Sequence, residues 1–181
     1  MNTLQPLGPA VYGEALENLV QQYLVSISGV EPSLVRPRWQ PDPPRAPGFD
    51  VDWLAVGVEN IARSWQPYQW IRTLVRRETI TVALTAYGPN SMGLVALIQD
   101  NIQQSLNHGV LSENGLKYIR STDIVAAPEL VNSKWLRRHD INVILGRAVT
   151  REYDVLTIAS ANVILNSDMP SSQSIEVRND Q

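Results

Sequence analysis

Apolar side chains recur at the spacing of an α-helix in the first part of the chain. The residues on one helical face, following Pro9, are Tyr12, Leu16, Leu19, Val20, Tyr23, Leu24 and Ile27. Because proline fits the first turn of a helix, this pattern predicts an amphipathic helix that runs to about Ser26, with Gly29 as its stop. A short strand is expected over Leu34–Gln40, and the prolines of residues 41–48 predict a loop without regular structure.

Strand periodicity is clearest over Arg77–Tyr87, where apolar residues alternate with residues that are mostly threonine. The preceding segment, Asp52–Glu59, is short and apolar and predicts another strand, in which Gly57 marks a bulge or a close approach. After a turn at residues 88–91, a second amphipathic helix is expected to close near residues 107–109 with a glycine cap. Its apolar positions are Leu94, Val95, Ile98, Ile102 and Leu106.

The last third of the chain is rich in strand-like segments. We expect strands over Tyr118–Val125, Asp140–Val149 and Tyr153–Leu165, the last two joined as a hairpin across residues 150–152. Residues 166–181 hold no apolar cluster and are expected to be a flexible C-terminal tail. The order of elements predicts an α+β fold: one domain over residues 1–165 with a mainly antiparallel sheet and two amphipathic helices packed on one face.

Length and composition narrow the class of protein. The chain has 181 residues, of which 44% are hydrophobic and 18% charged, so it fits one domain with a sizeable core. Its 15 Lys and Arg against 18 Asp and Glu give a net charge of -3, which argues against wrapping DNA or binding an anionic membrane. The absence of cysteine excludes disulfides, thiolate metal sites and thiol nucleophiles. No segment approaches the length of a membrane span.

Two places invite comparison with catalytic motifs. Asp50 and Asp52 form a D-x-D pair that could hold a divalent metal, but no phosphate loop or second acidic cluster accompanies them, which favours a solvated strand start. Ser91 follows a strand and opens a helix, as in a nucleophile elbow, yet proline stands at position 89, where that motif needs glycine. The two histidines, His108 and His139, fit capping or surface roles. We therefore expect no enzyme and no cofactor.

Aromatic and basic residues supply the candidate contact sites. Five Trp and six Tyr stand against one Phe, and Trp and Tyr are the rings favoured at protein interfaces. We expect the tryptophans and arginines to contact partners. Alternatively, the tryptophans complete the core beneath a long loop, and the arginines form a charged sheet edge that prevents aggregation. If the two basic clusters met in one patch, they could dock an acidic partner or the backbone of passing DNA. The candidate residues are Trp39, Trp65, Trp70, Arg72, Arg76, Arg77, Arg137 and Arg138.

The order of these features resembles the phage neck terminator, or tail terminator, proteins of tailed bacteriophages. An amphipathic helix and a proline-rich stretch precede the strand Arg77–Tyr87, which ends in Tyr-Gly and opens into a helix. The segment Trp135–Val143 then begins the closing strands, so the resemblance spans roughly residues 9 to 165. The family commonly has an aspartate and an aromatic residue before Tyr-Gly, whereas this chain has Leu84, Thr85 and Ala86.

The resemblance implies a structural virion protein without catalytic activity. It implies a ring, a homohexamer, that caps the tail tube, stops tail polymerisation and joins the tail to neck or head-completion proteins. DNA would pass through the lumen without specific binding, and assembly would take place in the host cytoplasm, with no membrane involved. The alternatives are another tail-assembly protein, such as a tail completion factor or a tube-like subunit, and a small metal-dependent or serine hydrolase using Asp50, Asp52 or Ser91.

Overall fold

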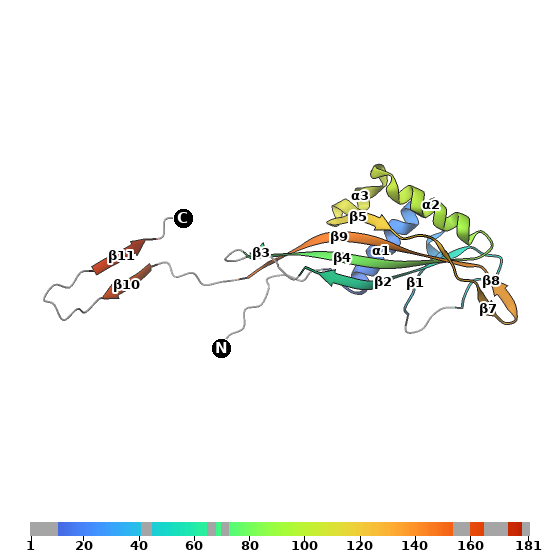
Figure 1. Ribbon diagram of the computed structural model, residues 1–181, viewed down its shortest axis with the longest axis horizontal. Coiled ribbons are helices and arrows are strands. Elements are labelled where there is room, and N and C mark those ends of the chain that lie inside the picture. The colour runs from blue at the N-terminus through green and yellow to red at the C-terminus, as the bar shows by residue number, and fades with distance from the viewer. Residues whose placement is uncertain are drawn as a thin grey trace.

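A seven-stranded sheet is the centre of the computed structural model, which describes residues 11–40, 45–64, 68–69, 73–153, 160–164 and 174–178. The sheet has the strand order β1-β2-β4-β9-β5, while β3 pairs with the start of β4 and β6 with the start of β9 (Figure 1). The β1–β2 pair is parallel and the other pairs of this sheet are antiparallel. Its strands are β1 (Val35–Pro37), β2 (Trp53–Arg63), β3 (Tyr68–Gln69), β4 (Thr73–Tyr87), β5 (Leu116–Ser121), β6 (Val125–Ala126) and β9 (Arg138–Glu152).

Two long central strands determine which residues share a face. β4 and β9 each contain 15 residues and pair along their whole length, from Thr73 opposite Glu152 to Tyr87 opposite Arg138. At a rise of about 3.4 Å per residue, each strand is roughly 50 Å long. Because successive side chains of a strand point to opposite sides, one side of β4 carries the buried Ile80, Val82, Leu84 and Ala86 and faces the core. The opposite side carries threonines and Tyr87. This is the alternation that the sequence predicts for Arg77–Tyr87.

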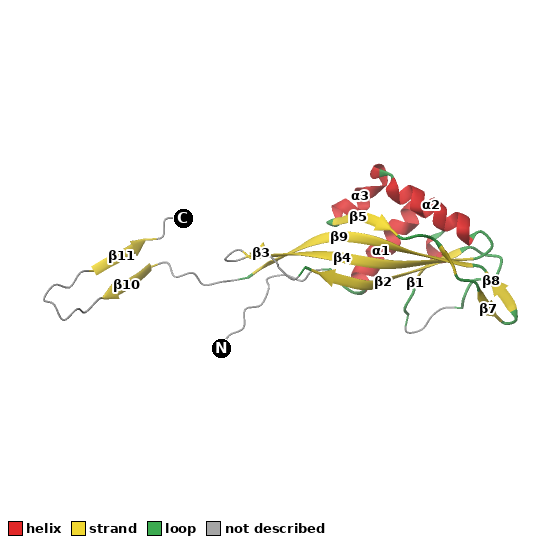
Figure 2. Ribbon diagram, in the orientation of Figure 1, coloured by secondary structure: helices red, strands yellow, loops and turns green. Residues whose placement is uncertain are grey.

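Helical segments complete the core (Figure 2). Buried side chains of all three α-helices join one cluster with the core-facing side chains of β2, β4 and β9. The side-chain amide of Asn101 donates a hydrogen bond of 2.7 Å to the Ile27 carbonyl and so ties α2 to the end of α1. The helical elements are α1 (Glu14–Ser28), η1 (Pro32–Leu34), α2 (Ser91–Gln103), η2 (Ser105–His108) and α3 (Gly109–Glu113). The α+β class and the mainly antiparallel sheet are confirmed, with three α-helices where two are predicted.

The ends of the helices differ from the sequence-based boundaries. Helix α1 begins at Glu14, because Gly13 takes a positive φ of 60°, and Tyr12 therefore lies before the helix. Gly29, with φ 68°, ends α1 as predicted. Helix α2 ends at Gln103, because Gln104 is extended, and Gly109 does not cap α2 but has a right-handed helical backbone at the start of α3. His108 does act near this end of α2, since its Nε2 lies 2.6 Å from the Ile102 carbonyl oxygen.

The strands near the C-terminus also correct the sequence-based picture. The hairpin predicted between Asp140–Val149 and Tyr153–Leu165 is wrong, because β9 continues to Glu152 and β10 (Ser160–Ile164) pairs with β11 (Ser174–Arg178). The strand β11 falls in the segment expected to be a tail, whose other residues lie outside the described part. A further hairpin, β7 (Glu129–Val131) and β8 (Lys134–Leu136), is not predicted from the sequence.

The proline-rich segment is described in part. Residues 45–48 have no regular secondary structure, as expected, and residues 41–44 lie outside the described part. Within the described residues, no helix is long and apolar enough to cross a membrane.

Candidate partner-contact sites

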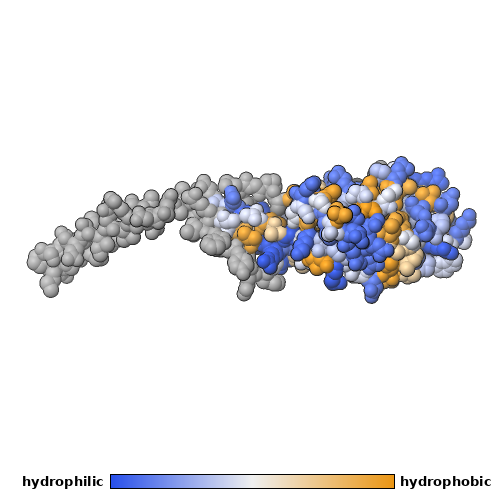
Figure 3. All heavy atoms as spheres, turned by 90° about the horizontal axis from the view of Figure 1, so that it is seen from above, coloured by the Kyte–Doolittle hydropathy of each residue, from blue (hydrophilic) through white to orange (hydrophobic). Residues whose placement is uncertain are grey.

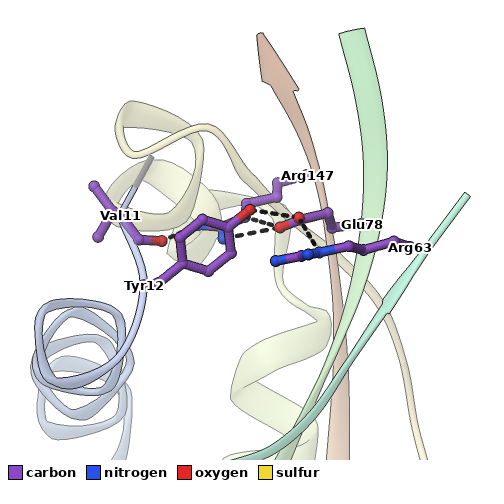
Figure 4. A network of polar contacts seen from close by, with 5 residues as sticks. All are labelled: Val11, Tyr12, Arg63, Glu78 and Arg147. Carbon is purple, nitrogen blue, oxygen red and sulfur yellow. Dashed lines mark hydrogen bonds and ion pairs between the residues drawn. The ribbon is translucent and has the colours of Figure 1, made fainter. Parts of the chain in front are cut away.

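A buried carboxylate organises the polar cluster at one end of the sheet (Figure 4). Glu78, on the core-facing side of β4, has a side chain that is only 1% exposed. Tyr12 donates a hydrogen bond of 2.5 Å to its Oε1, Arg63 of β2 donates one of 3.1 Å to the same oxygen, and Arg147 of β9 donates one of 2.9 Å to Oε2. Arg147 also donates through Nη1 to the Val11 carbonyl at 2.6 Å. The cluster therefore joins the segment before α1 to three strands.

The electrostatics of the cluster favour the charged form of Glu78. Burial raises the pKa of this carboxyl, but hydrogen bonds from Tyr12 and Arg147 and the charges of Arg147 and Arg63 together hold it below its usual value of 4.5. The Arg147 and Arg63 guanidinium groups also lie over the Tyr12 ring, at 4.5 and 5.4 Å from its centroid. Because Glu78 stays ionised, it holds both arginines and the tyrosine in place.

A cavity of about 190 Å³ lies beside this cluster. Tyr12, Arg63 and Glu78 form part of its wall, and Arg76 and Arg151 add two further guanidinium groups. The Nε of Arg76 is buried and makes no hydrogen bond to the described residues. The wall of the cavity thus carries more positive than negative charge.

An aromatic and basic row crosses the other end of the sheet, on the side opposite the core. Trp53 of β2 and Tyr87 of β4 are direct cross-strand neighbours, and their rings stack with centroids 4.2 Å apart and an interplanar angle of 11°. Arg36 of β1 lies 5.9 Å from the Trp53 ring centroid, and Arg138 of β9 lies 5.8 Å from that of Tyr87. A stacked aromatic pair flanked on each side by a guanidinium group therefore runs across four strands, a composition enriched at the energetic centres of interfaces.

Arg138 is held in this row by two carboxylates. Its Nε and Nη2 donate to the two carboxylate oxygens of Asp140 at 2.9 and 2.8 Å, and Nη1 contacts Glu129 of β7. The hydrogen bonds to Asp140 are the main reason that the pKa of Arg138 is raised above its ordinary value. Burial raises the pKa of Asp140, but the hydrogen bonds and charge of Arg138 lower it overall. The contact with Glu129 ties the β7–β8 hairpin to the central sheet.

Trp39 lies on the same side of the sheet, above Gly57. A Cβ atom at Gly57 would collide with the Trp39 ring, so the predicted close approach at this glycine is confirmed. The bulge of β2 lies instead between Val58 and Asn60. The Trp39 side chain is 53% exposed, and Arg38 lies 5.7 Å from its ring centroid. The absence of a side chain at Gly57 therefore lets the Trp39 ring pack on the backbone while part of the ring stays exposed to solvent.

The β7–β8 hairpin carries exposed apolar side chains. Leu130 and Trp135 are direct cross-strand partners and are 61% and 71% exposed. Both residues of its turn, Asn132 and Ser133, have positive φ angles of 49° and 60°, as in a type I′ turn. A cavity of about 410 Å³ lies between this hairpin and residues 45–49. Figure 3, which looks onto the side of α2 and α3, shows that apolar surface also lies among hydrophilic residues there.

The structure separates the basic residues that the sequence suggested could meet. Arg76 and Arg77 lie near the start of β4 and Arg138 lies opposite its end, so about 11 residues, or roughly 35 Å of strand, separate the two clusters. The hypothesis that both clusters form a single basic patch is therefore wrong. Arg77 and Arg137 are exposed, Arg76 is half-buried, and Trp65, Trp70 and Arg72 lie outside the described residues.

The candidate catalytic residues have structural partners. The Ser91 Oγ and the His139 Nδ1 lie 2.9 Å apart, so a serine and a histidine do meet, but Ser91 is 0% exposed. The Ser91 hydroxyl is therefore closed to solvent in this structure. Asp52 accepts a hydrogen bond of 2.8 Å from the backbone N–H of Asn90 and so supports the turn before α2. Within the described ranges, no group of three His, Asp or Glu side chains is placed to hold a metal.

Comparison with known protein families identifies the chain. The family model described as phage neck terminator protein matches residues 14–168, which is most of the sequence. The chain belongs to the phage neck terminator family. A search of curated proteins gave no match. This neck terminator is therefore a structural protein of the bacteriophage virion, located in the tail and neck and associated with other proteins there.

Sequence reasoning missed two features of this neck terminator. The Glu78 cluster was hidden because its members are distant in sequence: Arg63 and Arg147 reach Glu78 through strand register, and Tyr12 reaches it from the segment before α1. The exposed pair Leu130–Trp135 was missed because strands of three residues are too short to show periodicity. The Asn132-Ser133 pair was the available signal for that turn.

Proposed function

We propose that this neck terminator closes into a homohexameric ring that caps the tail tube and stops its polymerisation. The ring joins the tail to neck or head-completion proteins, and DNA passes through its lumen without specific binding. The observation that carries the proposal is the family match over residues 14–168. The net charge of -3 agrees with a conduit that does not retain DNA. The activity requires no cofactor and no catalytic step.

A closed ring needs two different surfaces on each subunit, because head-to-tail contacts generate rings. The aromatic and basic row (Arg36, Trp53, Tyr87 and Arg138) and the exposed pair Leu130–Trp135 lie toward the same end of the sheet. Trp39, which is 53% exposed, adds another exposed ring besides that of Trp135. These side chains have the size and the chemistry of interface anchors, and they support contacts with neighbouring subunits or with the tail tube.

The proposal is tested by native mass spectrometry of the purified chain, alone and mixed with tail tubes of the same phage, together with electron microscopy of the tube ends. We expect a closed oligomer, or density that caps one end of each tube. Unlimited polymerisation would indicate a tube-like subunit, and a stable monomer that leaves tube ends bare would indicate another role in tail assembly.

Matched variants locate the contact surface. Trp135→Ala is expected to keep the thermal stability of the free chain, because the side chain is 71% exposed, while weakening ring closure or tube capping. Leu97→Ala, on α2 and 46% exposed, is the control at another exposed apolar position. Equal effects of the two variants on capping would remove the hairpin from the proposed interface.

A further inference from the structure

The cavity beside Glu78 has the properties of a binding site. Its wall contains the guanidinium groups of Arg63, Arg76 and Arg151 and one carboxylate, that of Glu78. Glu78 already interacts with two arginines, Arg63 and Arg147. Among the described residues, Arg76 and Arg151 form no ion pair. Two positive charges at the cavity therefore remain without an internal partner in that part of the chain.

Part of the cavity wall is fixed in advance by hydrogen bonds, and part of it offers a donor that is free within the described part of the chain. The hydrogen bonds from Tyr12, Arg63 and Arg147 hold the part of the wall around Glu78 in one arrangement, so this part loses little side-chain freedom on binding. The buried Nε of Arg76 lacks a hydrogen-bond acceptor among the described residues, and an entering oxyanion would supply one. Guanidinium groups match the planar geometry of a carboxylate with two parallel hydrogen bonds.

We infer that this cavity binds a carboxylate side chain carried by an acidic segment of a protein partner. The volume of about 190 Å³ is below the ~300 Å³ at which drug-sized ligand pockets begin, so it suits a side chain. Leu74 and Val149 form apolar parts of the wall. A side chain on a flexible segment can enter such a recess, whereas the phosphates of duplex DNA lie on a stiff rod and favour exposed basic surfaces. The inference does not depend on ring formation.

The test uses the full free chain and observes the Arg76 Nε–H resonance by NMR during titration with an oligoglutamate peptide. An oligoglutamine peptide of equal length controls for non-specific contacts, and inorganic phosphate and a short DNA duplex are titrated separately. We expect a saturable shift with oligoglutamate that falls as salt is added, and no shift with oligoglutamine. Arg76→Gln and Arg151→Gln should each weaken binding at least about tenfold, and the exposed control Arg120→Gln should not change it.

Several results would overturn the inference. The first is the absence of a shift with oligoglutamate. The second is an equal affinity of the wild type and the Arg151→Gln variant for oligoglutamate. The third is Arg76-dependent binding of phosphate or duplex DNA that is tighter than the binding of oligoglutamate. The wild-type titration does not depend on whether a variant folds. Tyr153 forms part of the cavity wall, and Asp154 directly follows it in the sequence. The variant Asp154→Asn therefore tests whether a carboxylate of the same chain occupies the cavity. Sharply tighter binding of oligoglutamate to that variant would also contradict a partner-derived carboxylate.

Discussion

Glu78→Gln is the most direct probe of how the sheet is joined to the segment before α1. The substitution keeps the size of the side chain and removes its charge. Arg147, whose side chain is 8% exposed, then loses its carboxylate partner inside the protein. Arg63 is 50% exposed and can turn toward water, so its loss of a partner costs little. The effect should therefore come almost wholly from Arg147 and Tyr12.

The magnitude follows from these exposures. Removing one partner of a buried ion pair typically costs about 3–5 kcal/mol, and the partly exposed Arg63 adds at most about 1 kcal/mol. Glutamine can still accept hydrogen bonds, which favours the lower end of the range. We expect the free energy of unfolding to fall by about 3 kcal/mol and the melting temperature by roughly 6–12 °C for a chain of this size.

The assay is urea unfolding of wild type and Glu78→Gln, followed by far-UV circular dichroism at several pH values. Glu59→Gln is the control, because Glu59 lies exposed on β2, and its effect should stay within about 0.5 kcal/mol. Since the folded-state pKa of Glu78 lies below 4.5, its stabilising contribution is present above pH 4.5 and is lost as the pH falls through the folded-state value. The difference between wild type and Glu78→Gln should therefore shrink in acid.

Two outcomes would contradict the predicted role of Glu78. One is a loss of stability in Glu78→Gln no larger than that in Glu59→Gln, which would mean that the cluster does not stabilise the fold. The other is a difference between wild type and Glu78→Gln that stays constant from neutral pH down to the acid limit of folding. That result would mean that the charge of Glu78 is not the source of its contribution.

Three further predictions concern the turn before α2. Gly88→Ala should lower the free energy of unfolding by more than about 2 kcal/mol, because the φ of Gly88 is 112° and the new Cβ would lie 2.6 Å from a backbone oxygen. The control is Gly115→Ala, at a glycine with φ 68° and open space around it, which should cost about 1 kcal/mol. Thermal unfolding measures both effects. Asp52→Ala should lower stability by about 1 kcal/mol in urea titration, and Asp50→Ala should have no measurable effect. A fluorophosphonate probe should not label buried Ser91 in the native protein, and labelling detected by mass spectrometry would restore the hydrolase hypothesis.

The long central elements could be predicted from the sequence because their burial is periodic. The alternation of Arg77–Tyr87 reflects a strand with one side in the core, and the helical spacing from Leu16 to Ile27 reflects a helix with one buried face. Tyr12 fits the same helical spacing but lies outside α1, since the backbone at Gly13 leaves the helical region. Periodicity cannot detect a backbone dihedral angle, and this is why the start of the helix was misplaced.

Pairing partners were beyond the reach of local patterns. The segment Asp140–Val149 is strand-like, but its extension to Glu152 depends on pairing with β4. Likewise, the pairing of β10 with β11 joins segments ten residues apart rather than the adjacent strands that a short connection suggested. Local propensity identifies a strand, whereas hydrogen bonding to another segment determines its length and its neighbour.

The α+β class, the strand character of Arg77–Tyr87 and the family of the chain could be inferred from the amino-acid sequence, because these depend on local periodicity and on the order of elements. Which charged residues meet depends on the register of distant strands. Glu78 and Arg76 share a side of β4 by alternation alone, but Arg147 and Arg63 reach Glu78 through the register of two other strands. The same register places Arg138 at the far end, because antiparallel pairing puts the start of β9 beside the end of β4.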